Sequence, residues 1–249
     1  YLRTKDKVRT RDGKQDTCSF GTYAGYRGVA YGCIKELYMS KRGILTVMSG
    51  FSGAGKGTIV KALLEKHEYF LSISCTTREP RPGEENGREY FFVSREEFEN
   101  MIHNNEMIEW AEYAGNYYGT PKKAVEQWLS EGKDVILEIE VQGGMQVKAL
   151  FPYAVLLFVI PPSADELLNR LRARGTENET QIGLRFEQTV RETRYIKDYD
   201  YVVLNDDLDQ AVDKVHAIID SQRAKPINMI DEIRSLSRDL SKLIQESNL

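Results

Sequence analysis

A glycine-rich segment with a single lysine is the part of this sequence best suited to chemistry. Residues 50–58 read Gly50-Phe51-Ser52-Gly53-Ala54-Gly55-Lys56-Gly57-Thr58. Glycines let backbone N–H groups turn onto phosphate oxygens, a helix N-terminus adds partial positive charge, and the lysine can reach the outer phosphates. The segment predicts a phosphate loop that holds a nucleoside triphosphate. A merely flexible glycine-rich turn is the alternative for the motif taken alone.

The residue after the lysine differs from the common form of this motif, which has serine or threonine there as a magnesium ligand. Here the position is Gly57, and the nearest hydroxyl belongs to Thr58. We therefore expect Mg²⁺ to be held partly through water, near Thr58 and near Glu138, which ends a predicted strand close to the expected phosphates.

Two arginines three residues apart form a second candidate site. Arg78 and Arg81 lie in a loop bounded by prolines. Because a guanidinium group matches two phosphate oxygens at once, the pair can form a fork for a phosphate monoester. The hydroxyls of Tyr90 and Tyr118 could complete that cage. For two isolated arginines, a solvated surface pair is the usual alternative.

The elements around these segments alternate between strands and helices from residue 43 to about residue 222. Short apolar runs predict strands at 44–48, 135–140, 154–160 and 201–204, and such runs suit a parallel sheet covered on both faces. Helical patterns occupy 59–64, 121–131, 163–174 and 206–222, with Pro121 and Ser163 as start signals. Residues 72–120 are more polar and contain short strand-like pieces. The sequence therefore predicts an α/β fold, a three-layer parallel-sheet core with an inserted subdomain of mixed α and β structure.

The two ends of the chain differ from this pattern. Residues 1–38 show neither helical nor strand periodicity and precede the first methionine, Met39, so we interpret them as a disordered or non-native extension. A basic tail that docks a partner is the alternative. Residues 226–249 carry apolar residues three or four apart, which predicts an amphipathic helix. This helix either packs on the domain or pairs with another subunit in a homo-oligomer.

Composition argues against several classes of protein. The net charge of −4 and the pI near 5.6 argue against a nucleic-acid binder that works by neutralising phosphates. No run of about 20 apolar residues is present, so we expect no membrane span. The three cysteines, Cys18, Cys33 and Cys75, are too scattered for a disulfide framework or a zinc site. We therefore expect unpaired thiols and a cytoplasmic protein.

Five further segments narrow the class of enzyme. They are Ser74-Cys75-Thr76-Thr77-Arg78-Glu79-Pro80-Arg81-Pro82-Gly83-Glu84, Asn86-Gly87-Arg88-Glu89-Tyr90-Phe91, Ile108-Glu109-Trp110, Asn116-Tyr117-Tyr118-Gly119-Thr120 and Glu138-Ile139-Glu140-Val141-Gln142-Gly143. Together with the phosphate loop they resemble guanylate kinase of the bacterial type, in the nucleoside monophosphate kinase family of P-loop proteins. The resemblance runs from about residue 43 to residue 222. It implies a GMP-binding insertion at about 72–120, a lid at about 170–190, and transfer of the γ-phosphate of ATP to GMP, and to dGMP, in purine nucleotide metabolism.

The resemblance also implies how guanine is recognised. Glu109 occupies the position that accepts both the N1–H and the exocyclic amine, while Ser74 and Thr120 offer hydroxyls to O6. Glu140 matches a second acidic position near the base, where many relatives have aspartate. Adenine would leave the buried charge of Glu109 unpaired, and such a mismatch supports strong discrimination.

The transfer machinery follows from the same resemblance. Arg170, Arg174 and Arg185 match the lid arginines that contact the transferring phosphates beside Lys56, whereas Arg172 has no clear match. Asn205 follows the fourth predicted strand and could contact adenine, because doubly wound folds bind ligands outside the carboxyl ends of their strands. Phosphoryl transfer depends on positioning and charge neutralisation, so no nucleophile or base is assigned.

Two other functions are compatible with the same motifs. Domains that resemble guanylate kinase also serve as non-catalytic interaction modules that bind phosphorylated peptides, although their phosphate loops are usually degraded. A P-loop kinase with another monophosphate acceptor is the second alternative, against which Glu109, Ser74 and Thr120 argue.

Overall fold

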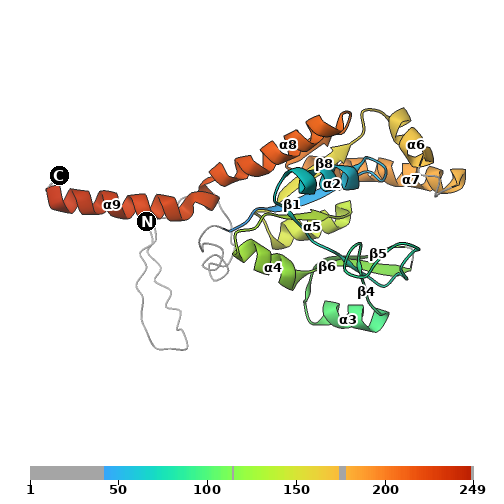
Figure 1. The fold of residues 1–249 in the computed structure, drawn as a ribbon, viewed down its shortest axis with the longest axis horizontal. Helices are drawn as coiled ribbons and strands as arrows, with labels where there is room; N and C mark the ends of the chain where they lie inside the picture. The colour runs from blue at the N-terminus through green and yellow to red at the C-terminus, as the bar shows by residue number, and fades with distance from the viewer. Residues whose placement is uncertain (1–41, 114, 174–177, 248–249) are drawn as a thin grey trace, which may run out of the picture. The chain divides into compact units, whose positions relative to one another are not determined.

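The fold is built on a five-stranded parallel sheet in the order β2-β7-β1-β8-β9. The computed structural model describes residues 42–113, 115–173 and 178–247 (Figure 1). The predicted extension 1–38 lies outside the described residues, as do Cys18, Cys33 and Arg174. The strands are β1 (Leu45–Gly50), β2 (Phe70–Leu71), β7 (Val135–Glu138), β8 (Val155–Ile160) and β9 (Tyr201–Leu204). The predicted α/β class and parallel core are confirmed.

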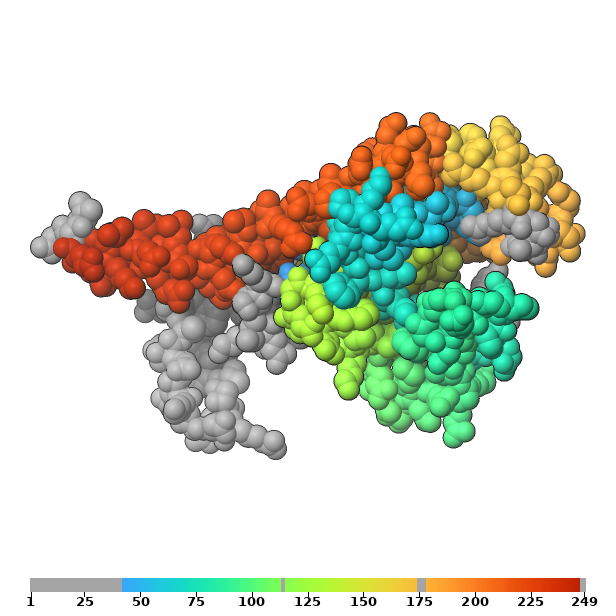
Figure 2. Space-filling view, viewed as in Figure 1, coloured from blue at the N-terminus to red at the C-terminus, as the bar shows by residue number. Residues whose placement is uncertain are grey.

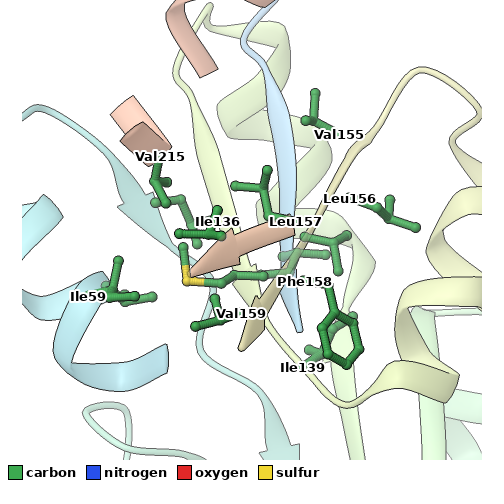
Figure 3. Close-up of a cluster of buried hydrophobic side chains, with 14 of the residues drawn as sticks. Ile59, Ile136, Ile139, Val155, Leu156, Leu157, Phe158, Val159 and Val215 are labelled. Carbon is green, nitrogen blue, oxygen red and sulfur yellow. The ribbon is translucent and has the colours of Figure 1, made fainter. Parts of the chain in front are cut away.

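Helices cover both faces of this sheet and complete the three layers. Figure 1 shows α2 (Lys56–Lys66) and α8 (Leu208–Ser221) on one face, with α4 (Lys122–Ser130) and α5 (Val141–Leu150) on the other. The core between them is aliphatic, and in Figure 3 Ile59 of α2 and Val215 of α8 lie on the side of Ile136 and Val159. Because the central strands are buried on both faces, β8 is a continuous apolar run and β1 is buried throughout, with Thr46 and Ser49 as its polar residues.

A second, four-stranded sheet forms the insertion, in the order β4-β3-β6-β5. Its strands are β3 (Cys75–Thr76), β4 (Phe91–Phe92), β5 (Met107–Tyr113) and β6 (Asn116–Pro121), and α3 (Arg95–His103) lies between β4 and β5 in the chain. Ser94 and Glu97 cap α3 reciprocally, as their spacing favours. The insertion has a small core of its own, formed by Cys75, Phe98 and Met107, while Ile108 of β5 packs in the main core.

Two helices, α6 (Ala164–Ala173) and α7 (Glu179–Glu192), follow β8, and the 3₁₀ segment η1 (Thr193–Asp198) leads from α7 to β9. The predicted N-cap is confirmed, because Ser163 Oγ accepts a hydrogen bond of 3.0 Å from the backbone N–H of Glu166. Arg172 is exposed and pairs with Glu179, with Nε–Oε1 and Nη2–Oε2 distances of 3.0 and 2.9 Å. This pair joins the end of α6 to the start of α7.

The chain ends in a long helix. The 3₁₀ segments η2 (Gln222–Ala224) and η3 (Pro226–Met229) lead into α9 (Ile230–Ser247), which carries the predicted apolar row. Leu236 and Leu240 in this row are 61% and 51% exposed, so α9 does not pack on the described part of the domain. None of the helices in residues 42–113, 115–173 and 178–247 has the length and apolar character that a membrane crossing requires.

Candidate active site

The glycine-rich loop takes the form that the sequence predicts, between β1 and α2. Gly55 is the N-cap of α2 and has φ 94°, a left-handed conformation that favours glycine. A methyl group on Gly55 would lie 2.2 Å from Nδ2 of Asn205, so the position also requires a residue without a side chain. The loop therefore presents its backbone at the N-terminus of α2, where backbone N–H groups and the helix dipole favour anions.

Lys56 folds back over this loop. Its Nζ donates to the carbonyl oxygens of Gly50 and Phe51, at 2.7 and 3.3 Å. The next residue, Gly57, lies beside Glu138, because a methyl group there would be 3.6 Å from both carboxylate oxygens. The Glu138 carboxylate thus lies beside the place where the motif usually carries a hydroxyl.

Two cavities border the loop. The larger, of about 450 Å³, is lined by Gly53, Gly55, Thr58, Arg170, Ala173, Asn205, Asp206 and Leu208. The smaller, of about 180 Å³, is lined by Phe51, Ser52, Gly53, Gly55, Lys56, Gly57, Glu138 and Glu140. Thr58 lines the larger cavity and Glu138 the smaller, so the two residues predicted near the metal border the loop from different cavities. Lys56 instead shares the smaller cavity with both glutamates.

The two described arginines of the predicted lid both contact the loop. Arg170 of α6 donates from Nη1 to the carbonyl oxygen of Ala54 at 3.3 Å and from Nη2 to the backbone oxygen of Asn205 at 3.0 Å, and its Nε pairs with Glu166 at 2.7 Å. Arg185 of α7 donates to Oγ of Ser52 at 2.7 Å. The helices α6 and α7 therefore direct positive charge at the loop.

Asn205 connects the end of β9 to the same loop. Its side chain is buried, and Nδ2 donates to the carbonyl oxygen of Ala54 at 2.8 Å. The amide group predicted to contact adenine thus holds the loop, while the residue lines the larger cavity. Asp207 caps α8 by accepting from the backbone N–H of Gln210 at 2.9 Å.

The arginine fork lies in the insertion and already has a partner. Arg78 Nη2 pairs with the Glu84 carboxylate at 3.0 Å, and the same carboxylate accepts from the backbone N–H of Arg81 at 2.8 Å. Tyr90 and Tyr118 lie edge to face with ring centres 6.0 Å apart, and the Arg78 guanidinium lies 5.6 Å from the Tyr90 ring centre. The structure brings Arg78, Tyr90 and Tyr118 together, and adds Glu84, which sequence reasoning missed.

Glu109 is a buried carboxylate, 6% exposed. It accepts a 2.7 Å hydrogen bond from Oγ1 of Thr120, its neighbour on β6. Burial raises the pKa of Glu109 to about 7, with a smaller rise from Glu140, while the hydrogen bonds from Thr120 act in the opposite direction. The structure therefore brings the two residues predicted to face guanine into direct contact.

A bulge in β5 turns Glu109 toward the core. The pairing with β6 shifts between Met107 and Glu109, so that Ile108 is an extra residue. Ile108 packs in the main core, and Glu109 lies against α5, where a methyl group on Gly143 would be 2.5 Å from its Oε2. A bulge lets two consecutive side chains face the same way, which strict alternation forbids. Gly143 thus provides the space for this carboxylate.

Gln146 of α5 fixes the backbone next to Glu109. Its Oε1 accepts from the backbone N–H of Trp110 at 3.2 Å, and its Nε2 donates to the carbonyl oxygen of Trp110 at 3.0 Å. This two-point contact joins the insertion to the core helix. Of the other residues predicted near guanine, the half-buried Ser74 immediately precedes β3, and the exposed Glu140 is the N-cap of α5.

A phosphate loop at the end of a parallel strand, with arginines directed at it from two helices, defines a nucleotide-binding protein of the P-loop α/β class. The family model for guanylate kinase matches residues 42–222. The guanylate kinase of Caldanaerobacter subterraneus subsp. tengcongensis is 52% identical over 188 residues, which are 75% of this chain and 91% of the relative. The guanylate kinase of Bacillus subtilis is 50% identical over 189 residues, 75% and 93% of the two chains.

A solved structure agrees with these relatives. The crystal structure of guanylate kinase from Anaplasma phagocytophilum superimposes with a TM-score of 0.63 at 32% identity, over 77% of this chain and 92% of that one. This chain belongs to the guanylate kinase family.

Proposed function

We propose that this chain transfers the γ-phosphate of ATP to GMP and dGMP, giving ADP and GDP or dGDP. Family membership supports the reaction, and the buried pair of Glu109 and Thr120 beside α5 supports the acceptor. Guanine offers two donors to one carboxylate and an O6 that accepts from a hydroxyl. The Glu109 carboxylate, which has no cationic partner among the described residues, can accept both donors. The hydroxyl of Ser74, or that of Thr120 once it turns from Glu109, can donate to O6.

The donor side is supported by the loop and its cations. The backbone N–H groups of the loop would bind the β- and γ-phosphates, with Lys56 moving from the carbonyls of Gly50 and Phe51 to the phosphate oxygens. Arg170, Arg185 and the undescribed Arg174 would neutralise charge that spreads over the transferring group. The larger cavity, beside Asn205, would hold the adenosine.

The acceptor side is the insertion. Arg78 and Arg81, with the hydroxyls of Tyr90 and Tyr118, would hold the GMP phosphate after Arg78 exchanges Glu84 for phosphate oxygens. One of these oxygens attacks the γ-phosphorus while the bond to the β,γ-bridging oxygen breaks, and ADP leaves with that electron pair. The protein's contribution is to align the two phosphates and exclude water.

Magnesium fits the residues of the smaller cavity. Glu138 places carboxylate oxygens next to Gly57 and the loop, and Mg²⁺ binds through one or two carboxylates, water and substrate phosphates. Glu138 would hold the ion through water, with Thr58 as a second water-linked position. When bound, the ion would neutralise charge on the β- and γ-phosphates.

We propose the cytoplasm as the location, where both nucleotides are available. Beyond these nucleotides we propose a second copy of the chain as a partner, bound through α9. A non-catalytic interaction module is disfavoured because the loop retains Lys56 and its glycines.

The test is a coupled assay with ATP and a panel of GMP, dGMP, AMP, UMP and CMP. We expect turnover of the two guanine nucleotides only. Lys56→Ala should abolish turnover while leaving the affinity for GMP nearly intact. Glu109→Ala should chiefly lower the affinity for GMP. ATP binding without turnover of GMP would contradict the proposal. If Glu109→Ala kept the same selectivity for GMP over AMP, the assignment of Glu109 would be contradicted.

A further inference from the structure

The helix α9 carries a row of exposed apolar side chains that nothing in the described chain covers. Ile233, Leu236, Leu240, Leu243 and Ile244 are 46–61% exposed, and Figure 2 shows α9, in red, at the surface. An isolated helix of 18 residues is marginally stable in water, and a continuous apolar face marks an interaction surface. The guanylate kinase match ends at residue 222, so α9 lies beyond the part of the chain that the family describes.

The spacing of this row is that of a coiled coil. The a positions of a seven-residue repeat hold Ile233 and Leu240, and the d positions hold Met229, Leu236 and Leu243. The e positions beside them hold Ile230, Ser237 and Ile244, and the g positions on the other side hold Glu232, Asp239 and Glu246. No polar residue interrupts the a and d positions from 229 to 243, as packing against another helix requires.

The flanking rows select the direction of a pair of identical helices. In an antiparallel pair of identical helices each g row faces the other g row, which would bring two acidic rows together. In a parallel pair each g row faces the e row of the partner, which is uncharged here. Like charges across a helix interface disfavour the antiparallel arrangement. We infer that two copies of this chain pair through α9, side by side and in the same direction.

Other occupants fit this helix less well. A helix that lies on an anionic membrane has a basic polar face. The polar side of α9 instead mixes acidic Asp231, Glu232, Asp239 and Glu246 with basic Arg234, Arg238 and Lys242. If residues 1–41 of the same chain covered the row, the protein would be a monomer. The mass of the protein in solution distinguishes this case from a dimer. The inference rests on α9 alone and is independent of phosphotransferase activity.

The first test is the mass of the full chain by light scattering after size exclusion. We expect about twice 28.6 kDa for the natural sequence. Leu236→Glu and Leu240→Glu should each give the monomer, while Gln245→Glu, which adds the same charge on the polar side, should leave the dimer intact. Thermal unfolding and turnover of GMP verify that each variant is folded. A monomeric natural chain, or a dimer that persists in both leucine variants, would overturn the inference.

The second test is the direction of the pair. The starting protein is the full chain with Cys18, Cys33 and Cys75 replaced by alanine. After the further substitution Leu243→Cys, the cysteines at position 243 of two chains should form a disulfide under mild oxidation. Two such cysteines face each other only when the helices are parallel, because residue 243 lies near one end of α9. Gln245→Cys is the matched control and should not cross-link. A dimer without the disulfide at position 243 would overturn the parallel arrangement, and a monomer that sediments with phosphatidylglycerol vesicles would assign α9 to a membrane surface.

Discussion

Replacing Glu109 by glutamine should stabilise the ligand-free protein and remove recognition of guanine. The carboxyl group is 6% exposed and accepts from Thr120 without a cationic partner in the described structure. Glutamine has nearly the same shape, and its carbonyl oxygen can still accept from Thr120. Its NH₂ group, however, would face the N–H donors of guanine.

The size of the stabilisation follows from the pKa of Glu109, raised from 4.5 to about 7. Between these values the folded protein holds a proton that the unfolded chain has released, so the free energy of unfolding falls as the pH rises through this window. The cost of the buried charge is ~3 kcal/mol at pH 8 and less than ~1 kcal/mol at pH 5. The N-terminal turn of α5 beside the carboxylate offsets part of this cost, so the first figure is an upper bound.

The measurement is the unfolding of both proteins in urea at pH 8 and pH 5 without nucleotide. We expect Glu109→Gln to be more stable than the natural chain at pH 8 by up to ~3 kcal/mol, equivalent to roughly 5–10 °C in Tm. At pH 5 the difference should nearly vanish. Turnover of GMP should fall by ~100-fold or more, because glutamine leaves two donors opposed. This account of Glu109 would be refuted if the variant were less stable than the natural chain at pH 8. It would also be refuted if the difference in the free energy of unfolding were the same at both pH values.

Three further predictions concern the same carboxylate and its supports. The Kd for GMP, measured by calorimetry, should rise about tenfold from pH 8 to pH 6 as Glu109 takes up a proton. Glu109→Gln is the control, because any rise in its Kd reports the titration of GMP itself. Equal dependence of Kd on pH in the two proteins would exclude the effect. Gln146→Leu should raise KM for GMP by up to ~30-fold with KM for ATP unchanged, since two hydrogen bonds of ~1 kcal/mol each are lost. Gln142→Leu on the same helix should change neither constant. Gly143→Ala should lower the affinity for GMP at least ~10-fold, because the added methyl group crowds the Glu109 carboxylate. Gly183→Ala in α7 is the control: a methyl group there meets no atom within 4 Å, so it should raise the free energy of unfolding by ~1 kcal/mol and leave the affinity for GMP unchanged.

The core of the fold was predictable because its strands carry local signals. The runs at 44–48, 135–140, 154–160 and 201–204 correspond to β1, β7, β8 and β9, since burial on both faces requires continuous apolar side chains. The helix α5 was missed for an equally physical reason. Its adjacent Gly143 and Gly144 lower helix propensity, yet both are needed, because methyl groups there would meet Glu109 and the Tyr199 hydroxyl.

The supports of the site could not be predicted from the sequence. Gln146 contacts a residue 36 positions away, so no local pattern marks it. In the sequence, Glu84 cannot be distinguished from an ordinary surface glutamate. Only the folded loop places its carboxylate between Arg78 and the backbone of Arg81. The β5 bulge breaks the alternation on which strand patterns rest, so the direction of Glu109 followed from the family resemblance alone.

The cations of the site have partners within the protein itself. Lys56 donates to Gly50 and Phe51, Arg170 to Ala54, and Arg78 pairs with Glu84. Binding is therefore an exchange of partners, and the internal acceptors compete with ADP and GDP once transfer is complete. We expect this competition to limit affinity for products and to hasten their release, the step that often sets the turnover rate in enzymes that close over their substrates.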